Sequence, residues 1–152
     1  MKVIQGDLIQ LALAGEFDVI VHGCNCMCVM DAGIARAIKQ AFPEAALSDQ
    51  QTQPKDRSKL GSLTYATVER SGLELTIVNG YIQYDYRGSG VLVDYDALRS
   101  VMREVRRRFS GRRIGYPKIG AGLAKGDWSI IAPILDEELA GEDHTLVEYV
   151  AQ

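Results

Sequence analysis

Short apolar runs alternate with helical patterns along most of the chain. The runs typical of strands are Lys2 to Gln5, Val19 to His22, Ser62 to Glu69, Leu75 to Asn79, Ile114 to Pro117 and Thr145 to Val150. Helical patterns lie between them, near Leu8 to Leu13, Gly33 to Phe42, Asp94 to Phe109 and Trp128 to Leu139. This alternation predicts one layered α/β domain rather than a helical bundle or a β-sandwich.

Several boundaries follow from single residues. Apolar residues recur every three or four positions in Ile34 to Phe42, and Pro43 is expected to end that helix. Asp127 is a good N-cap for the last helix, whereas Pro133 lies too deep for a first-turn proline and predicts a kink or a split. Polar residues dominate Ser48 to Lys59, which predicts an exposed loop or a frayed helix end.

Composition narrows the class of protein. A length of 152 residues fits one domain, residues 1–152. No apolar run approaches the roughly 20 residues of a membrane span, and Met1 to Asp7 enter a strand pattern at once, without the regions of a signal peptide. We therefore expect a cytoplasmic protein with no membrane partner. Nothing in the sequence decides its oligomeric state, and a monomer is the simplest expectation for a domain of this size.

The charge of the chain argues against a general nucleic-acid binder. Its net charge is -3, whereas affinity for a phosphate backbone comes from clustered cations. One basic cluster surrounds the helix near Asp94 to Phe109, and we interpret it as a solvated helix face. Its members are Arg103, Arg106, Arg107, Arg108, Arg112 and Arg113.

Four strands run into loops of glycine, asparagine and small residues. The segments are Val3 to Asp7, Val21 to Asn25, Ile77 to Gly80 and Pro117 to Leu123. In open α/β sheets, ligands bind outside the carboxyl ends of strands. We therefore expect these four loops to converge on one crevice that forms the site.

Two of the loops offer backbone amides to an anion. Gly120 to Asp127 is glycine-rich and precedes a helix, so it could cradle a diphosphate, or it could be merely a tight connection. It lacks the Walker pattern of a nucleoside triphosphatase and the G-x-G-x-x-G pattern of a dehydrogenase after the first strand. Asp31 to Arg36 also lead into a helix. There the amides could bind phosphate, or the Asp31 carboxylate could occupy them as an N-cap.

His22, Cys24, Cys26 and Cys28 alternate, so an extended chain would place them on one face. They could be zinc ligands, but no second cluster with metal-site spacing exists, and buried small side chains are the simpler interpretation. No local positive charge is evident to activate a catalytic cysteine. His22 could act as a general acid or base, or it could be packed and satisfied in the interior. We expect no metal and no cofactor.

Polar and aromatic residues near these loops could hold a nucleotide. The Asn25 amide could hold two sugar hydroxyls, or it could form an Asx-turn. The tyrosines Tyr81, Tyr84, Tyr86 and Tyr149 offer flat faces to an adenine or a ribose, although some of them will be core.

In combination, these motifs resemble the macrodomain family, and within it the branch of ADP-ribose-1''-phosphate phosphatases and ADP-ribosyl hydrolases. The resemblance covers nearly the whole chain. It rests on Gly6-Asp7-Leu8, Val21-His22-Gly23-Cys24-Asn25-Cys26, Ala32-Gly33-Ile34-Ala35, Pro117-Lys118-Ile119-Gly120-Ala121-Gly122-Leu123, Trp128 and Tyr149.

The resemblance implies a three-layer fold, with a mixed six-stranded sheet between helices and ADP-ribose across its crest. It implies that Asp7, with Leu8 beside it, and Tyr149 bind the adenine, and that Asn25 holds the distal ribose. His22 would be the catalytic candidate, together with Asn25. The diphosphate would lie between two sets of residues: Gly33, Ile34 and Ala35 on one side, and Gly120, Ala121, Gly122 and Leu123 on the other.

The chain departs from the family at three places. Members that use a catalytic lysine have it at the end of the fourth strand, where this chain reads Asn79-Gly80, and their loop aspartate falls on Ala124. The lysine-dependent mechanism is therefore not expected. Asp31 stands where many members have glycine, which brings a negative charge close to the diphosphate and could favour a different ligand.

Three hypotheses result. The first is a hydrolase that cleaves a phosphate or an ester at the distal ribose, and the resemblance around His22 favours it. The second is a reader that binds free or macromolecule-linked ADP-ribose without turnover, or a hydrolase acting on such modified macromolecules. The third, a thiol-metal module, would require zinc to copurify with the chain.

Overall fold

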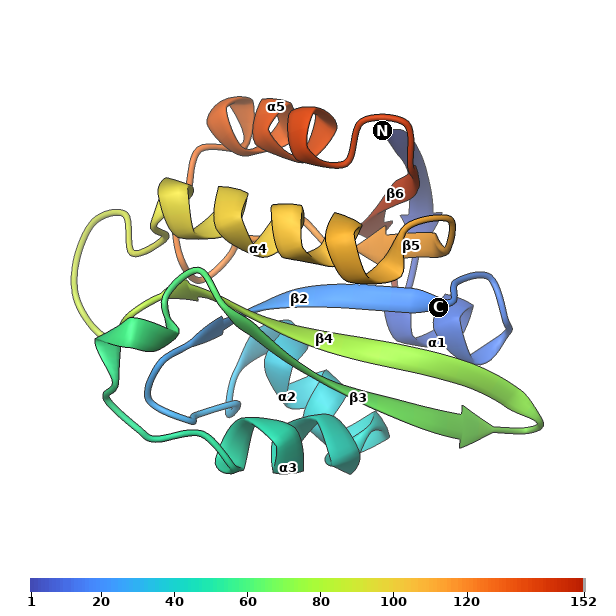
Figure 1. The fold of residues 1–152 in the computed structure, drawn as a ribbon, viewed down its shortest axis with the longest axis horizontal. Helices are drawn as coiled ribbons and strands as arrows, with labels where there is room; N and C mark the ends of the chain where they lie inside the picture. Colours follow the sequence, from blue (N-terminus) through green and yellow to red (C-terminus); the bar gives the residue numbers. More distant parts are fainter. Residues whose placement is uncertain (152) are drawn as a thin grey trace.

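The computed structural model describes residues 1–151 and contains a six-stranded sheet between two layers of helices (Figure 1). The strands are β1 (Lys2–Gly6), β2 (Val19–Asn25), β3 (Leu63–Arg70), β4 (Leu73–Gln83), β5 (Arg113–Tyr116) and β6 (Asp143–Tyr149). Their order across the sheet is β1-β6-β5-β2-β4-β3. Only the β3–β4 pair is antiparallel, so the sheet is mixed, as the resemblance implied.

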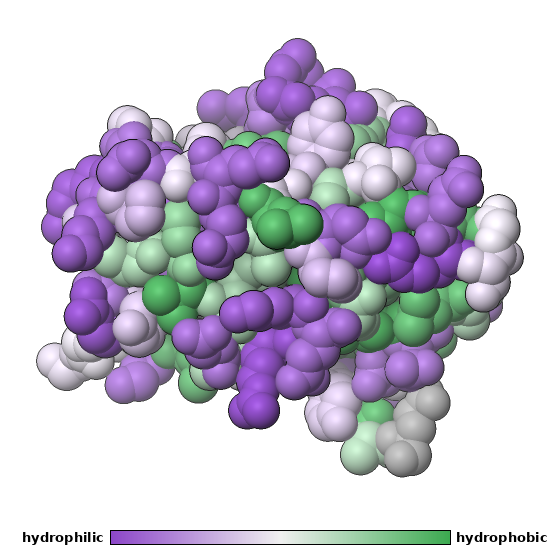
Figure 2. Space-filling view, turned by 90° about the horizontal axis from the view of Figure 1, so that it is seen from below, coloured by the Kyte–Doolittle hydropathy of each residue, from purple (hydrophilic) through white to green (hydrophobic). Residues whose placement is uncertain are grey.

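Helices cover both faces of the sheet. They are α1 (Leu8–Leu13), α2 (Gly33–Ala41), α3 (Pro43–Gln50), α4 (Tyr95–Phe109) and α5 (Trp128–Glu138), with a short 3-10 turn at Arg57–Lys59. In Figure 1, α4 and α5 lie above the sheet, while α1, α2 and α3 lie below it. Each face has its own apolar core. On the surface seen from below, polar residues alternate with apolar areas (Figure 2).

Strand β2 shows how the sequence builds this arrangement. Val19, Ile20 and Val21 are all fully buried, because a central parallel strand is covered on both faces. Val19 and Val21 belong to the core under α4 and α5, whereas Ile20 belongs to the opposite core. Since side chains alternate along a strand, His22 follows Ile20 onto the face covered by α2 and α3.

The structure differs from the predictions at two helices. Sequence reasoning placed no helix after Pro43, yet α3 occupies Pro43–Gln50, and its last turn begins the segment that was expected to be an exposed loop or a frayed end. Pro43 does end α2, but it is also the first residue of α3. A proline is tolerated there because the backbone N–H that it lacks would have no partner within the helix. Pro133 was expected to kink or split the last helix; α5 is not split, because it continues through Pro133.

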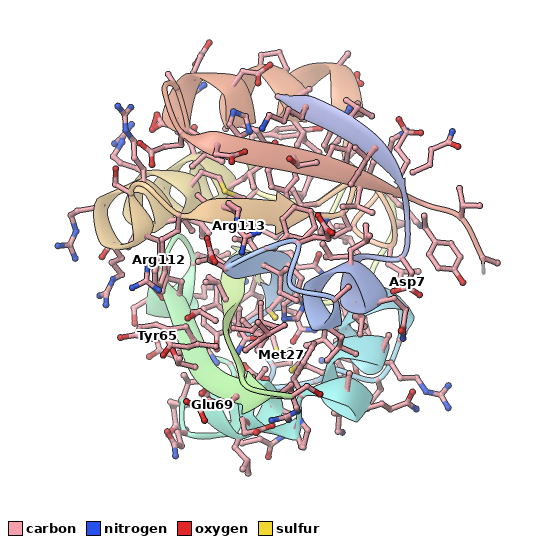
Figure 3. The ribbon with its side chains drawn as sticks, turned by 90° about the vertical axis from the view of Figure 1, so that its right-hand side faces the viewer. Asp7, Met27, Tyr65, Glu69, Arg112 and Arg113 are labelled. Carbon is pink, nitrogen blue, oxygen red and sulfur yellow. The ribbon has the colours of Figure 1, made fainter. Side chains whose placement is uncertain are left out.

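The basic cluster on α4 is largely paired with acids. Arg103 contacts Glu138 at 3.0 Å, and Arg113 contacts Asp18 at 2.9 Å. Figure 3 shows Arg112 and Arg113 beside each other at the end of this layer. None of the helices in residues 1–151 has the length and apolar character that crossing a membrane requires.

Candidate functional site

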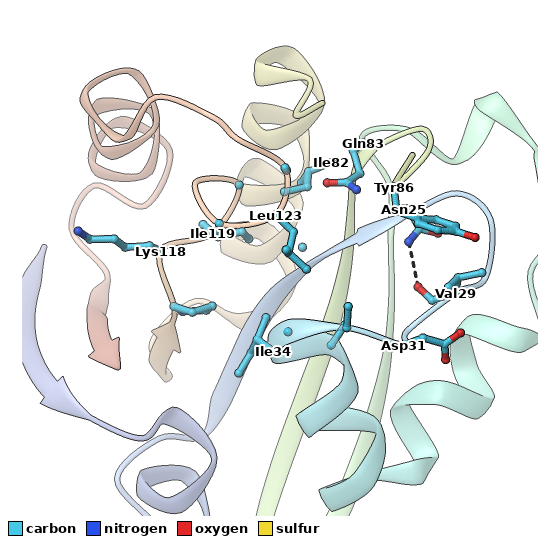
Figure 4. Close-up of a pocket in the computed structure, with 18 residues that line it drawn as sticks. Asn25, Val29, Asp31, Ile34, Ile82, Gln83, Tyr86, Lys118, Ile119 and Leu123 are labelled. Carbon is cyan, nitrogen blue, oxygen red and sulfur yellow. Dashed lines mark hydrogen bonds between the residues drawn. The ribbon is translucent and has the colours of Figure 1, made fainter. Parts of the chain in front are cut away.

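A cleft of about 430 Å³ opens where β2 and β4 end (Figure 4). Three loops and two strand ends form it. The first contributors are Gly23, Asn25 and Val29, followed by Asp31, Ala32, Gly33, Ile34 and Ala35 at the start of α2. The others are Ile82, Gln83, Tyr86, Pro117, Lys118, Ile119, Gly120, Gly122, Leu123 and Ala124. Strand ends and glycine loops that are distant in sequence therefore share one cavity.

The start of α2 lines the cleft, and no side chain caps its first backbone amides. Ala32 is the N-cap residue, and its side chain forms no capping hydrogen bond. Asp31 does not cap the helix; its Oδ1 lies 3.4 Å from Lys39 Nζ. Gly33 has a φ of 58°, a left-handed conformation that favours glycine. The first amides of a helix lack intrahelical partners and carry the positive end of its dipole, so this turn can bind an anion.

The loop between β5 and α5 forms the opposite wall. Gly120 has a φ of 79°, and the Gly126 amide donates to the Gly120 carbonyl at 2.7 Å, which closes the loop on itself. Leu123 is 66% exposed, and its Cδ1 would lie only 3.1 Å from a Cβ placed on Gly33. The two loops therefore face each other closely. Ala121 belongs to this loop but is not one of the cleft-lining residues.

Asn25 lies at one end of the cleft and organises its own loop. Its Nδ2 donates to the Val29 carbonyl, and its Oδ1 accepts from the Met27 amide, both at 2.9 Å. This is the Asx-turn alternative. One amide hydrogen and one oxygen lone pair remain for a ligand, because a primary amide carries two donors and two acceptor sites.

His22 is fully buried and does not line the cleft. Its Nε2 lies 2.7 Å from Asn79 Oδ1, while Asn79 Nδ2 donates to the Ala45 carbonyl at 2.9 Å. Burial lowers the pKa of His22 to about 4, although the hydrogen bond to Asn79 opposes this. A neutral histidine enclosed under α3 has no access to a ligand in the cleft. Its geometry matches the packed, satisfied alternative and gives no support to a catalytic role.

The three cysteines do not share one environment. Cys24 and Cys26 are buried against Tyr81, and burial raises the pKa of both thiols. Cys28 lies beyond the end of β2, has a φ of 60°, and places its Sγ 3.5 Å from Lys59 Nζ. Within residues 1–151, no group of three or more His, Cys, Asp or Glu side chains is arranged to hold a metal ion.

Asp7 and Tyr149 lie together at the edge of the sheet, outside the cleft lining. Asp7 caps α1 by accepting from the amides of Ile9 and Gln10 at 2.9 and 3.1 Å (Figure 3). Tyr149 pairs in register with Gly6 and is 75% exposed, so its ring face is free. Leu8 is buried in the lower core, so only its backbone can face a ligand.

Sequence reasoning missed Gln83 at the cleft, whereas Tyr86 was one of the four tyrosines expected to face a nucleotide. Strand β4 continues past the predicted end at Asn79, and Gln83 and Tyr86 line the cleft beyond it. The apolar pair Tyr81-Ile82 after Gly80 was the signal for the longer strand. Of the other tyrosines, Tyr81 is core and Tyr84 is covered by Arg57, whose guanidinium lies 3.7 Å from the ring centre.

The fold and the cleft define an α/β ligand-binding domain, and comparisons with known proteins give its family. The family described as Macro domain matches residues 21–135. A relative from Enterobacteria phage T4, an uncharacterized 17.5 kDa protein in the tk-vs intergenic region, is 36% identical over 141 residues. That match covers 90% of this chain and 88% of the phage protein. The chain belongs to the macrodomain family.

Solved structures show the same fold. The macrodomain of Mycobacterium tuberculosis DarG is 21% identical, with a TM-score of 0.73, and the match covers 99% of this chain and 97% of that one. Thermosipho africanus DarTG, solved in complex with ADP-ribose, is 16% identical with a TM-score of 0.75. This second match covers 98% of this chain and 41% of that one. At these identities, the likeness concerns the fold alone.

Proposed function

We propose that this chain binds ADP-ribose, with the diphosphate held between the start of α2 and the loop Gly120–Leu123. The observation that carries the proposal is the pair of loops facing each other across the cleft, one of which presents helix-start amides without a side-chain cap. Membership of the macrodomain family and the ADP-ribose complex of the Thermosipho relative support it.

In this proposal the ligand extends from the sheet edge at β1 and β6 into the cleft. The adenine lies over the edge formed by β1 and β6, where Asp7 accepts from its amino group and the exposed ring of Tyr149 covers it. The distal ribose lies at the other end, beside Asn25. The Asp7 carboxylate can serve the adenine and the helix together, because its Oδ1 accepts both capping hydrogen bonds and its Oδ2 makes none of them.

Calorimetric titration with ADP-ribose tests the proposal. Asp7→Ala is expected to weaken binding by about 1 to 3 kcal/mol, the range for a lost buried hydrogen-bond partner. Asp7→Asn is the matched control for folding, because asparagine caps a helix as well as aspartate does. Asp7→Asn should keep the stability of α1 but still weaken binding. The asparagine oxygen would cap the helix, and its NH2 group, a donor, would then face the adenine amino group, which is also a donor. Failure of the unaltered protein to bind millimolar ADP-ribose would refute the proposal.

We propose hydrolysis at the distal ribose as a second candidate function. The phosphatase hypothesis assigned proton transfer to His22, which lies outside the cleft. The observation that favours hydrolysis is a different side chain: Asp31 brings a carboxylate into the cleft lining, and a carboxylate can take a proton from an attacking water. A lysine-dependent route is not proposed, because Gln83 occupies the end of β4.

Product analysis separates the enzyme from the reader. The purified protein is incubated with ADP-ribose-1''-phosphate and, separately, with an ADP-ribosylated protein. Release of phosphate or ADP-ribose that Asp31→Asn abolishes supports hydrolysis, provided that the variant still binds ADP-ribose. Binding without release of either product supports a reader.

A further inference from the structure

Asp31 gives one end of the cleft a negative charge. Its side chain is 72% exposed and belongs to the cleft lining. Figure 4 shows Asp31 on the same side as Asn25, Val29 and Tyr86, while Lys118 lies at the opposite side. The only carboxylate among the described lining residues therefore lies near the position assigned to the distal ribose, and the only lysine lies far from it.

Neighbouring cations neutralise this charge weakly. Lys39 Nζ lies 3.4 Å from Asp31 Oδ1, and both side chains are largely exposed, at 47% and 72%. An ion pair between two exposed side chains is weak in water, so a ligand can compete with Lys39 for the carboxylate. Arg87, which follows Tyr86 in sequence, is held by Asp85 through Nε at 3.0 Å and Nη2 at 2.9 Å. It is not one of the cleft-lining residues, and the Asp85 carboxylate offsets its charge.

The rest of this end offers acceptors, amides and an aromatic face. An ionised carboxylate only accepts hydrogen bonds, and a second phosphate offers it no donor. Such a phosphate would add charge repulsion to the diphosphate already held at the start of α2. A group that donates hydrogen bonds suits the same place. A planar cation suits it further, because it can bind the carboxylate through two hydrogen bonds and lie beside Tyr86, whose ring already has the Arg87 guanidinium 5.2 Å from its centre.

We propose that Asp31 selects the substituent on the distal ribose: neutral or cationic hydrogen-bond donors are accepted, and a phosphate ester is rejected. This inference rests on the proposed binding of ADP-ribose and on its orientation in the cleft. It assigns the chain to derivatives whose distal ribose is linked to a nitrogen-containing group, and it places ADP-ribose-1''-phosphate among the poor ligands.

Calorimetric titration with three probes tests this selection. The probes are ADP-ribose, ADP-ribose-1''-phosphate and ADP-ribosyl-agmatine, whose distal ribose carries a guanidinium. Analysis of each sample afterwards establishes that the probe stayed intact. The unaltered protein should bind the guanidinium probe more tightly than the phosphate ester. Asp31→Asn should tighten binding of the phosphate ester about tenfold and weaken binding of the guanidinium probe about tenfold, while ADP-ribose changes less than about threefold.

Asp96→Asn is the matched control. Asp96 is exposed in the first turn of α4, so its substitution changes the net charge equally without touching the cleft. It should leave all three dissociation constants unchanged. Opposite effects of Asp31→Asn on the two charged probes cannot come from general damage to the site, which would weaken every probe.

An equal change for all three probes in Asp31→Asn, or an unchanged preference between the two charged probes, would overturn the selection by Asp31. ADP-ribose binding would survive either result. Absence of ADP-ribose binding by the unaltered protein would instead refute the proposed function, and the selection would fall with it.

Discussion

Replacing His22 with glutamine distinguishes a structural histidine from a catalytic one. Asn79 uses its amide nitrogen to donate to Ala45 and to Thr64, so its oxygen faces His22 and accepts from Nε2. This network assigns the hydrogen of the neutral ring to Nε2. A glutamine amide nitrogen can occupy a similar position and donate the same bond. His22→Gln therefore keeps the hydrogen bond and removes the titrating group.

The size of the effect follows from the pKa of His22. This pKa is 6.5 in an unfolded chain and about 4 in the folded protein, mainly because burial disfavours the charged ring. Below pH 6.5 the unfolded chain binds a proton that the folded chain does not, so stability falls as the pH decreases toward 4. Each pKa unit corresponds to about 1.4 kcal/mol, which gives a loss of about 3 kcal/mol across this window. Above pH 6.5 the contribution is complete.

Urea denaturation of both proteins between pH 8 and pH 4 measures this loss. The pKa of His144 is also lowered by burial, but its contribution is common to both proteins and cancels in their difference. The free energy of unfolding of His22→Gln, relative to the unaltered protein, should rise by about 3 kcal/mol as the pH falls from 6.5 to 4. ADP-ribose affinity at neutral pH should not change. If the free energies of unfolding of the two proteins changed with pH in parallel, the structural role of His22 would be refuted. Loss of turnover in His22→Gln without any change in its stability profile would refute it as well.

Three further predictions concern the loops and α5. Gly126→Ala should destabilise the fold by more than about 1 kcal/mol in thermal denaturation, because the added Cβ would lie 2.5 Å from the Gly120 carbonyl oxygen; an unchanged melting temperature would contradict this. Pro133→Ala should stabilise the protein by about 1 kcal/mol or more in urea, because the exposed ring interrupts the hydrogen bonds of α5; a loss of stability would show that the ring packs usefully. Leu123→Ala should change the free energy of unfolding by less than about 0.5 kcal/mol but weaken ADP-ribose binding about fivefold in calorimetry, because this exposed side chain lies over Gly33; unchanged binding would place Leu123 away from the ligand.

Local patterns in the sequence were enough to predict the order of most strands and helices along the chain. Apolar alternation and three-to-four-residue spacing are local properties, so the segments that they mark could be placed without tertiary information. The glycine loops at Gly33 and Gly120 were also evident, because a positive φ demands a residue type that is visible in the sequence.

The roles of the side chains at these loops depend instead on contacts between segments that are distant in sequence. The alternation of His22 and Gly23 fixes that they point to opposite faces, but not that α3 covers the face of His22. Likewise, the choice between capping and exposure at Asp31 depends on where the chain enters α2, a backbone geometry that no residue type dictates.

Helix α3 is the clearest example of an element that local sequence patterns do not predict. Its sequence carries no strong amphipathic pattern, and its helical state depends on Ala45 and Ala46 packing into the lower core beside β3 and β4. Short helices of this kind gain most of their stability from tertiary contacts rather than from local propensity. The sequence therefore determined which groups were available to the site, and packing between distant segments determined which of them face the cleft.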